Sequence, residues 1–195
     1  MALPITYDSA RKLISVDSEV SYPELQDEVT QLNKLAKDLI SIQGEIPESA
    51  EPSNKITPLL KNLITSGIDA LRKKQFKDAI QKLTVAIEMQ QKRANWESFG
   101  VQLTELNGIL QARCDAYIMN KQFIEAYNDA DILLSTQVNT PDNFLRKAIA
   151  SLNLGRLEDA KVNLERGLCF HENDKRLIDH LNVVNRAIDL ENGDA

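Results

Sequence analysis

Apolar residues in the stretch 141–168 recur three and four positions apart, on both sides of a short break at Gly155 and Arg156. This spacing places side chains on one face of a helix, so the stretch predicts two helices joined by a tight turn. The first helix would bury Phe144, Leu145, Ala148, Ile149 and Leu152, and the second would bury Leu157, Ala160, Leu164 and Leu168.

The same pattern occurs twice more along the chain, with a small residue at the same place in the second helix. Ala160 follows Ala126 by 34 residues, which is the period of tetratricopeptide repeats (TPRs). Ala79 precedes Ala126 by 47 residues, so about 13 residues are inserted between the first two copies. One helix pair cannot bury its apolar face, but stacked pairs can. The predicted fold class is therefore mainly α, a three-repeat TPR α-solenoid with a capping helix.

A small β-hairpin and one further helix are expected before the repeats. Alternating residues flank a turn near Asp8, and Ser21 with Glu24 forms a capping box ahead of an apolar stripe. An isolated hairpin is marginally stable, so it must pack on the repeats or on a partner that adds a strand to its edge. The expected parts are a hairpin–helix appendage at 1–42, an acidic linker with prolines at 43–57, and a TPR domain at 58–195. Within that domain we expect repeats at about 60–93, 107–140 and 141–174, and a capping helix at 174–190.

The insertion, ANWESFGVQLTELNG at 94–108, has two possible structures. It either lengthens the flanking helices or forms a packed loop. Its pattern alone does not decide between them.

The net charge of the chain and its hydropathy limit the kinds of partner that we expect. The net charge of −6 argues against nucleic acid, which is bound mainly through basic side chains. No apolar run approaches the ~20 residues that a membrane span requires, so direct membrane insertion is not expected. If the protein works at a membrane, another protein must hold it there.

Catalytic and metal-binding patterns are missing from the sequence. It has no Gly-rich phosphate loop, no HExxH motif and no Cys or His cluster with zinc spacing. Cys114 falls where a TPR needs a small residue, so it is interpreted as a buried thiol. We therefore expect a binding protein that is not an enzyme and uses neither a cofactor nor a metal.

In TPR domains the first helices of the pairs line a concave groove that usually holds an extended peptide. The repeat register places Ile64, Ile68, Leu71 and Arg72 from repeat one in this groove, Gln111, Ala112, Asp115 and Ile118 from repeat two, and Leu145, Arg146, Ile149 and Asn153 from repeat three. The predicted groove has an apolar floor and an arginine in repeat three.

The segment LRKAIASLNLGRLEDAKVNLERGL resembles the third repeat of chaperone-binding TPR domains. Those domains hold the C-terminal EEVD tail of heat-shock chaperones in a carboxylate clamp, whose repeat-three arginine falls on Arg146, with Lys147 following. A guanidinium can bind a carboxylate through two parallel hydrogen bonds. The alternative is that Arg146 forms a structural ion pair with a neighbouring acid. The other clamp positions are changed: Ile64, Ile68, Ala112 and Asp142 replace a lysine, two asparagines and a second lysine.

A second resemblance covers nearly the whole chain. The hairpin, the acidic linker, AIEMQQKRANWESFGVQLTEL and the RKA, LEDA and ERGL motifs are similar to the cytosolic TPR subunits of the fungal Sec complex. KRANWESFGVQL is the most specific part, because ordinary TPR proteins have no reason to carry it. The resemblance implies a peripheral protein on the cytosolic face of the endoplasmic reticulum, held by a membrane-anchored subunit of the post-translational translocation complex.

The same resemblance implies a function. The protein would be a non-catalytic adaptor whose groove receives the C-terminal tail of cytosolic seventy-kilodalton heat-shock chaperones. The alternative is a purely structural TPR scaffold that stabilises its partner subunit without binding a chaperone.

Overall fold

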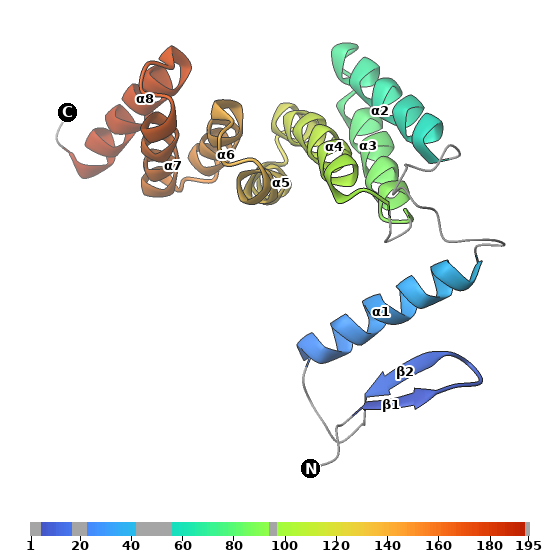
Figure 1. Ribbon diagram of the computed structural model, residues 1–195. Helices are drawn as coiled ribbons and strands as arrows, with labels where there is room; N and C mark the ends of the chain where they lie inside the picture. Colours follow the sequence, from blue (N-terminus) through green and yellow to red (C-terminus); the bar gives the residue numbers. More distant parts are fainter. Residues whose placement is uncertain (1–4, 17–22, 42–55, 94–96, 194–195) are drawn as a thin grey trace. The chain divides into compact units, whose positions relative to one another are not determined.

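The computed structural model describes residues 5–16, 23–41, 56–93 and 97–193 (Figure 1). The chain divides into two compact units, one comprising Met1–Ser53 with Lys92–Phe99 and the other Asn54–Gln91 with Gly100–Ala195. The predicted linker lies outside the described residues except for Ile56 and Thr57, as does the capping-box residue Ser21.

The N-terminal unit contains the predicted hairpin and helix. Strand β1 (Ile5–Asp8) pairs antiparallel with β2 (Leu13–Val16), and α1 (Pro23–Ser41) packs against β2. The turn is held by the Asp8 carboxylate, which accepts hydrogen bonds from the backbone N–H groups of Ala10 and Arg11 at 2.9 and 3.0 Å. These two short-range hydrogen bonds stabilise the turn between β1 and β2, at the place where the alternation of apolar and polar residues is interrupted.

The second unit is a stack of helix pairs. Its described helices are α2 (Ile56–Arg72), α3 (Phe76–Gln90), α4 (Phe99–Met119), α5 (Phe123–Thr136), α6 (Pro141–Asn153), α7 (Leu157–Phe170) and α8 (Lys175–Asn192). The first six form the three predicted TPR pairs, and α8 is the capping helix. The mainly α TPR fold with a small N-terminal hairpin is confirmed.

The three turns inside the helix pairs share one backbone geometry. Lys74, Lys121 and Gly155 occupy equivalent positions and all have positive φ, at 60°, 61° and 73°. In each turn the next residue donates its N–H to a carbonyl five residues earlier at 2.9 Å, for example Gln122 to Tyr117. This left-handed C-cap satisfies the free carbonyls at a helix end. The repeat therefore extends to the turns, even where lysine replaces glycine.

The recurring alanines form the helix contacts that define the stack. Ala79, Ala126 and Ala160 are fully buried. Ala79 packs with Ala70 and Ala116, which brings helices of adjacent repeats together without an intervening side chain. Small residues at these points allow the close packing that protein interiors require.

The structure shows how residues 97–108 of the insertion fold. Helix α4 begins at Phe99, well before the expected start of repeat two at about residue 107, so the second half of the insertion lengthens that helix. Ahead of α4, Arg93 and Glu97 are almost completely buried and form an ion pair with 2.5 Å between Nη1 and Oε2. Within the described ranges, every helix lacks the combination of length and apolar character that a membrane span needs.

Replacement of Gly67 by alanine is expected to destabilise the first helix pair. A Cβ at Gly67 would lie 2.8 Å from Cγ of Leu83 on α3, so the helices would have to separate. Gly67→Ala should lower the free energy of unfolding by about 1–3 kcal/mol. Gly108→Ala is a matched control, because a Cβ there meets nothing within 4 Å; it should raise stability by about 0.5–1 kcal/mol. Urea denaturation followed by circular dichroism measures both, and equal effects would contradict the close approach.

The two cysteines should differ in reactivity. Cys114 is fully buried, donates to the Ala126 carbonyl at 3.3 Å, and has its pKa raised to about 12, chiefly by burial. Cys169 is exposed. Because the thiolate is the reactive form, iodoacetamide at pH 8 should label Cys169 alone in the folded protein and both cysteines in denaturant. Peptide mass spectrometry reads out the sites, and fast native labelling of Cys114 would show that this core opens readily.

Candidate functional site

A cavity of about 400 Å³ lies along the first helices of repeats two and three and the start of α8. Its lining consists of Asp115, Ile118 and Met119 from α4, Asp142, Leu145, Arg146 and Ile149 from α6, and Arg176 from α8. Five of these residues, Asp115, Ile118, Leu145, Arg146 and Ile149, were predicted from the repeat register. The cavity therefore brings together five of the residues that were predicted for the groove.

Arg146 is engaged in a two-point ion pair across the cavity. Its Nε and Nη2 donate to the Asp115 carboxylate at 2.7 and 2.9 Å, and its Nη1 donates to Oδ1 of Asn143 at 3.1 Å. Burial opposes the charge on Arg146, but the hydrogen bonds and charge of Asp115 outweigh it, so the pKa of the guanidinium is raised. The predicted alternative of an ion pair with a neighbouring acid describes the structure as it stands. However, the Asp115 side chain remains 41% exposed, so this carboxylate can exchange its partner for water.

A second arginine at the cavity was not predicted from the sequence. Arg176, in the first turn of α8, pairs with Asp142 and with Asp174, the latter at 3.0 Å. Arg176 follows Asp142 by 34 residues, so it occupies the same repeat position one unit later. Continuing the 34-residue period into the capping helix would have predicted Arg176 at this position.

The cavity combines an apolar floor with balanced charge. Ile118, Met119, Leu145 and Ile149 supply apolar surface, while two arginines and two aspartates neutralise each other. Such a site can hold an apolar side chain and offer a guanidinium to a carboxylate that displaces one of the aspartates. In the part of the chain that the structure describes, no three His, Cys, Asp or Glu side chains are grouped so that they could hold a metal ion.

Four predicted groove residues of repeats two and three do not line this cavity. Ala112 packs instead on the core around Leu83 and Ile109. Lys147 is buried against α5, where its Nζ lies 2.7 Å from Asp131 and 4.9 Å from the centre of the Tyr127 ring. Adjacent helical residues do not face the same way, so Lys147 cannot accompany Arg146 into the groove. Gln111 bonds to Gln137 at 2.9 Å, and Asn153 is exposed and bonds to the backbone of its own helix.

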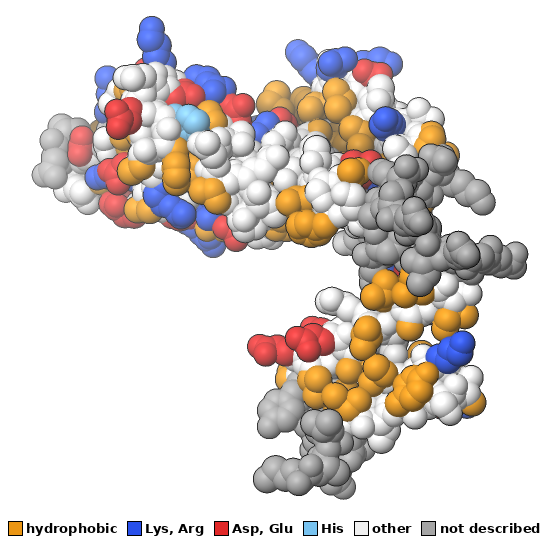
Figure 2. All heavy atoms as spheres, viewed as in Figure 1, with side chains coloured by type: hydrophobic (Ala, Val, Ile, Leu, Met, Phe, Trp, Pro, Cys, Tyr) orange, Lys and Arg blue, Asp and Glu red, His pale blue; other side chains and the backbone are white. Residues whose placement is uncertain are grey.

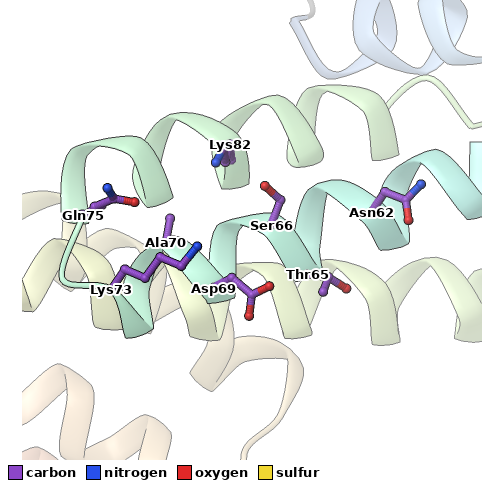
Figure 3. A pocket seen from close by; sticks show the side chains of 8 residues that line it. All are labelled: Asn62, Thr65, Ser66, Asp69, Ala70, Lys73, Gln75 and Lys82. Atoms are coloured by element: carbon purple, nitrogen blue, oxygen red, sulfur yellow. The ribbon is translucent and has the colours of Figure 1, made fainter.

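Repeat one places its predicted groove residues away from the cavity. Ile64 packs on the core around Leu60 and Leu83, Ile68 is half-buried, and Arg72 is exposed and pairs with Asp69 at 3.4 Å. The hollow beside α2 has a volume of about 310 Å³, with a polar lining that includes Ser66 and Asp69 from α2, Lys73 from the turn that follows it and Lys82 from α3 (Figure 3). None of the residues predicted for the groove lines it, so the isoleucines of repeat one do not extend the floor seen in repeats two and three.

Comparisons with known proteins connect this architecture to protein translocation. The chain is 34% identical over 176 residues to the translocation protein Sec72 of Saccharomyces cerevisiae, covering 89% of this chain and 90% of that protein. It is 27% identical over 123 residues to the ER protein translocation subcomplex subunit sec67 of Schizosaccharomyces pombe, covering 63% of this chain and 64% of that protein. No protein family model matches the sequence.

Solved structures of other proteins are also similar to this chain. A chain in the cryo-EM structure of the S. cerevisiae Sec complex superposes with a TM-score of 0.83 at 32% identity, over 96% of this chain and 99% of that one. The second TPR domain of human RPAP3, solved with the HSP70 peptide SGPTIEEVD, superposes with a TM-score of 0.52 at 19% identity, over 65% of this chain and 98% of that one. At that identity the second match shows the TPR fold alone.

Two similar arginine–aspartate pairs should differ in their contribution to stability. Arg113 holds Asp129 at 2.8 and 2.7 Å, as Arg146 holds Asp115, but the Asp129 side chain is only 5% exposed. Arg113→Met strands a buried carboxylate and should cost about 3–5 kcal/mol. Arg146→Met leaves Asp115 open to water and should cost about 1 kcal/mol or less. Urea unfolding at pH 7 measures both variants.

The dependence on pH provides a second readout of the same difference. Burial raises the pKa of Asp129 even though Arg113 opposes it, so the loss in Arg113→Met should shrink as the pH falls and Asp129 becomes protonated. Equal losses in the two variants at every pH would show that both pairs are equally structural.

Proposed function

The chain belongs to the Sec72 family of translocation proteins, and we propose that it is a non-catalytic adaptor subunit of the post-translational translocation complex at the endoplasmic reticulum. A membrane-anchored partner subunit would hold it on the cytosolic face. The near full-length similarity to Sec72 and to a chain of the Sec complex supports this assignment, as does the description of sec67 as a subunit of an ER translocation subcomplex. A surface built from helix pairs with a cavity on one side is suited to holding another chain.

The second part of the proposal concerns what the cavity holds. We assign it to the C-terminal tail of a cytosolic seventy-kilodalton heat-shock chaperone. A tail such as SGPTIEEVD offers an isoleucine and a valine for the apolar floor, and four carboxylates including the terminal one. The single observation that carries this proposal is the ion pair of Arg146 with an accessible acid, because it places an exchangeable guanidinium beside that floor.

Binding would proceed by exchange of partners. A tail carboxylate takes the two N–H donors of Arg146 while Asp115 turns to water. The gain is the difference between two similar ion pairs, so the affinity is expected to be modest compared with a clamp of unpaired bases. Asp142, which stands where the clamp has a lysine, is neutralised by Arg176 and therefore repels the tail less than its charge alone suggests.

Arg146 and Asp115 should have opposite effects on peptide affinity. We expect Arg146→Ala to weaken binding of labelled SGPTIEEVD by about tenfold or more, because a charged hydrogen-bond donor is lost and Asp115 is left to repel the peptide. Asp115→Ala frees Arg146 and should tighten binding by roughly threefold to tenfold. Fluorescence anisotropy at 50 mM and 200 mM salt measures the dissociation constants.

Arg186→Ala is the matched control, since Arg186 is exposed on α8 and does not line the cavity. Its affinity should equal that of the unmodified chain. If Arg146→Ala and Asp115→Ala both leave the dissociation constant unchanged, the peptide does not use this cavity.

The alternative function is a structural scaffold that stabilises its partner subunit without a chaperone. The full pairing of Arg146, Lys147 and Arg176 with acids favours it. Under this alternative the assembled complex would show no saturable binding of SGPTIEEVD up to about 1 mM, the weakest affinity that is readily distinguished from none.

A further inference from the structure

The two strands of the N-terminal hairpin differ in how their outward-pointing backbone groups are satisfied. At the centre of β2, the Asn33 side chain from α1 accepts the N–H of Ile14 at 2.8 Å and donates to its carbonyl at 2.7 Å. One amide side chain thus makes both bonds that a neighbouring strand would make. The outer edge of β2 is blocked at this residue.

The contact between Asn33 and Ile14 also determines which backbone groups of β1 point outward. Tyr7 lies opposite Ile14, and in an antiparallel ladder both members of a pair either bond to each other or both point outward. Because Ile14 bonds outward to Asn33, the N–H and carbonyl of Tyr7 point outward from β1, and those of Ile5, two residues earlier, do the same. The hairpin is a two-stranded sheet, and no further strand among the described residues pairs with β1.

The side chains along β1 are also left uncovered. Ile5 is 39% exposed and Tyr7 is 63% exposed, and they project from the same face of the strand. Apolar side chains gather on the visible surface of the hairpin–helix unit (Figure 2). Natural proteins often protect an open edge with lysine, proline or a bulge; ITYD has none of these, and its single charged residue, Asp8, stands at its end.

We propose that β1 receives an extended segment of another protein as a third strand, with main-chain hydrogen bonds to Ile5 and Tyr7. This proposal rests on the preceding one, because it takes that protein to be the membrane-anchored subunit of the same complex. Strand addition derives affinity from the backbone and selectivity from alternate side chains. The incoming strand would place apolar residues on the face of Ile5 and Tyr7 and polar residues beside Thr6 and Asp8.

Charge identifies the sign of the incoming segment. Residues 1–57 contain 10 acidic and 5 basic side chains, a net charge of −5. Most of this acidic excess is in the sequence that flanks the hairpin and α1, because residues 5–16 and 23–41 together hold five acidic and four basic side chains. A basic segment is attracted to these acidic flanks, while a second copy of the chain would bring like net charges together. We therefore favour a basic segment of a different protein over self-pairing.

Amide exchange in the assembled complex tests the main-chain bonds directly. Residue-resolved hydrogen–deuterium exchange compares the free chain with the chain bound to the anchored subunit purified in detergent. The Tyr7 amide should exchange at least about tenfold more slowly in the complex. The Ile14 amide is the internal control and should change little, because Asn33 already bonds it. An unchanged Tyr7 amide in a chain that remains bound would overturn the inference and leave the proposed function intact.

A pair of substitutions separates the backbone from the side chain. Tyr7→Pro removes the outward N–H without removing a ladder bond, which edge strands tolerate. Tyr7→Thr removes the ring but keeps the donor. We expect Tyr7→Pro to weaken binding to the anchored subunit by about tenfold or more, and Tyr7→Thr by less than about threefold, since main-chain bonds dominate strand addition.

Two controls measure the folding of the variants and the self-association of the free chain. Circular dichroism and Tm establish that both variants fold, and equal binding by the folded Tyr7→Pro variant would overturn the inference. Sedimentation of the free chain reports self-pairing, and a dimer that Tyr7→Pro abolishes would assign β1 to a second copy instead. If the unmodified chain fails to bind the anchored subunit, the proposed function itself fails.

Discussion

Close contact between helices at small side chains is the constraint on which this structure depends. Each TPR pair meets its neighbours at an alanine or a glycine, and Gly67 touches Leu83 so closely that even a methyl group would not fit. Because the spacing between helices is set at these points, the first helices of repeats two and three lie side by side with α8. That arrangement brings three residues that are remote in sequence, Asp115, Arg146 and Arg176, to one cavity.

The burial of the aspartate decides whether an arginine–aspartate ion pair is structural or exchangeable. Arg113–Asp129 and Arg146–Asp115 have nearly identical geometry, and each joins residues of different helices. Asp129 is buried, so its pair serves the core and is costly to break. Asp115 is half-exposed, so its arginine can be exchanged to another carboxylate. Under the proposed function, a chaperone-type clamp and a structural ion pair would be two states of one arginine, and the ligand's carboxylate would compete with Asp115.

The hairpin shows a similar division between a satisfied and an open side. Asn33 closes β2 by imitating a peptide group, and the turn is closed by Asp8. Among the described residues, no side chain or strand closes the outward backbone groups of Ile5 and Tyr7 on β1 in this way. Under the strand-addition proposal, this asymmetry would provide a second contact surface that needs no free charge or cavity, because an extended segment would satisfy the edge with its own main chain.

The sequence by itself determined the helix pairs, their register and the hairpin, because these follow from short-range periodicity and from a 34-residue repeat. It also predicted one shared face for Arg146 and Ile149, since the repeat assigns each position a face, and both residues line the cavity. Lys147 was misplaced, although the 100° step between adjacent helical residues would have separated it from Arg146. Only the tertiary structure decided that Asp115 holds Arg146, that the isoleucines of repeat one stand apart from the cavity, and that Asn33 blocks one strand edge. These contacts join residues between 19 and 31 positions apart, and no local pattern encodes which acid or amide meets which partner once the helices pack.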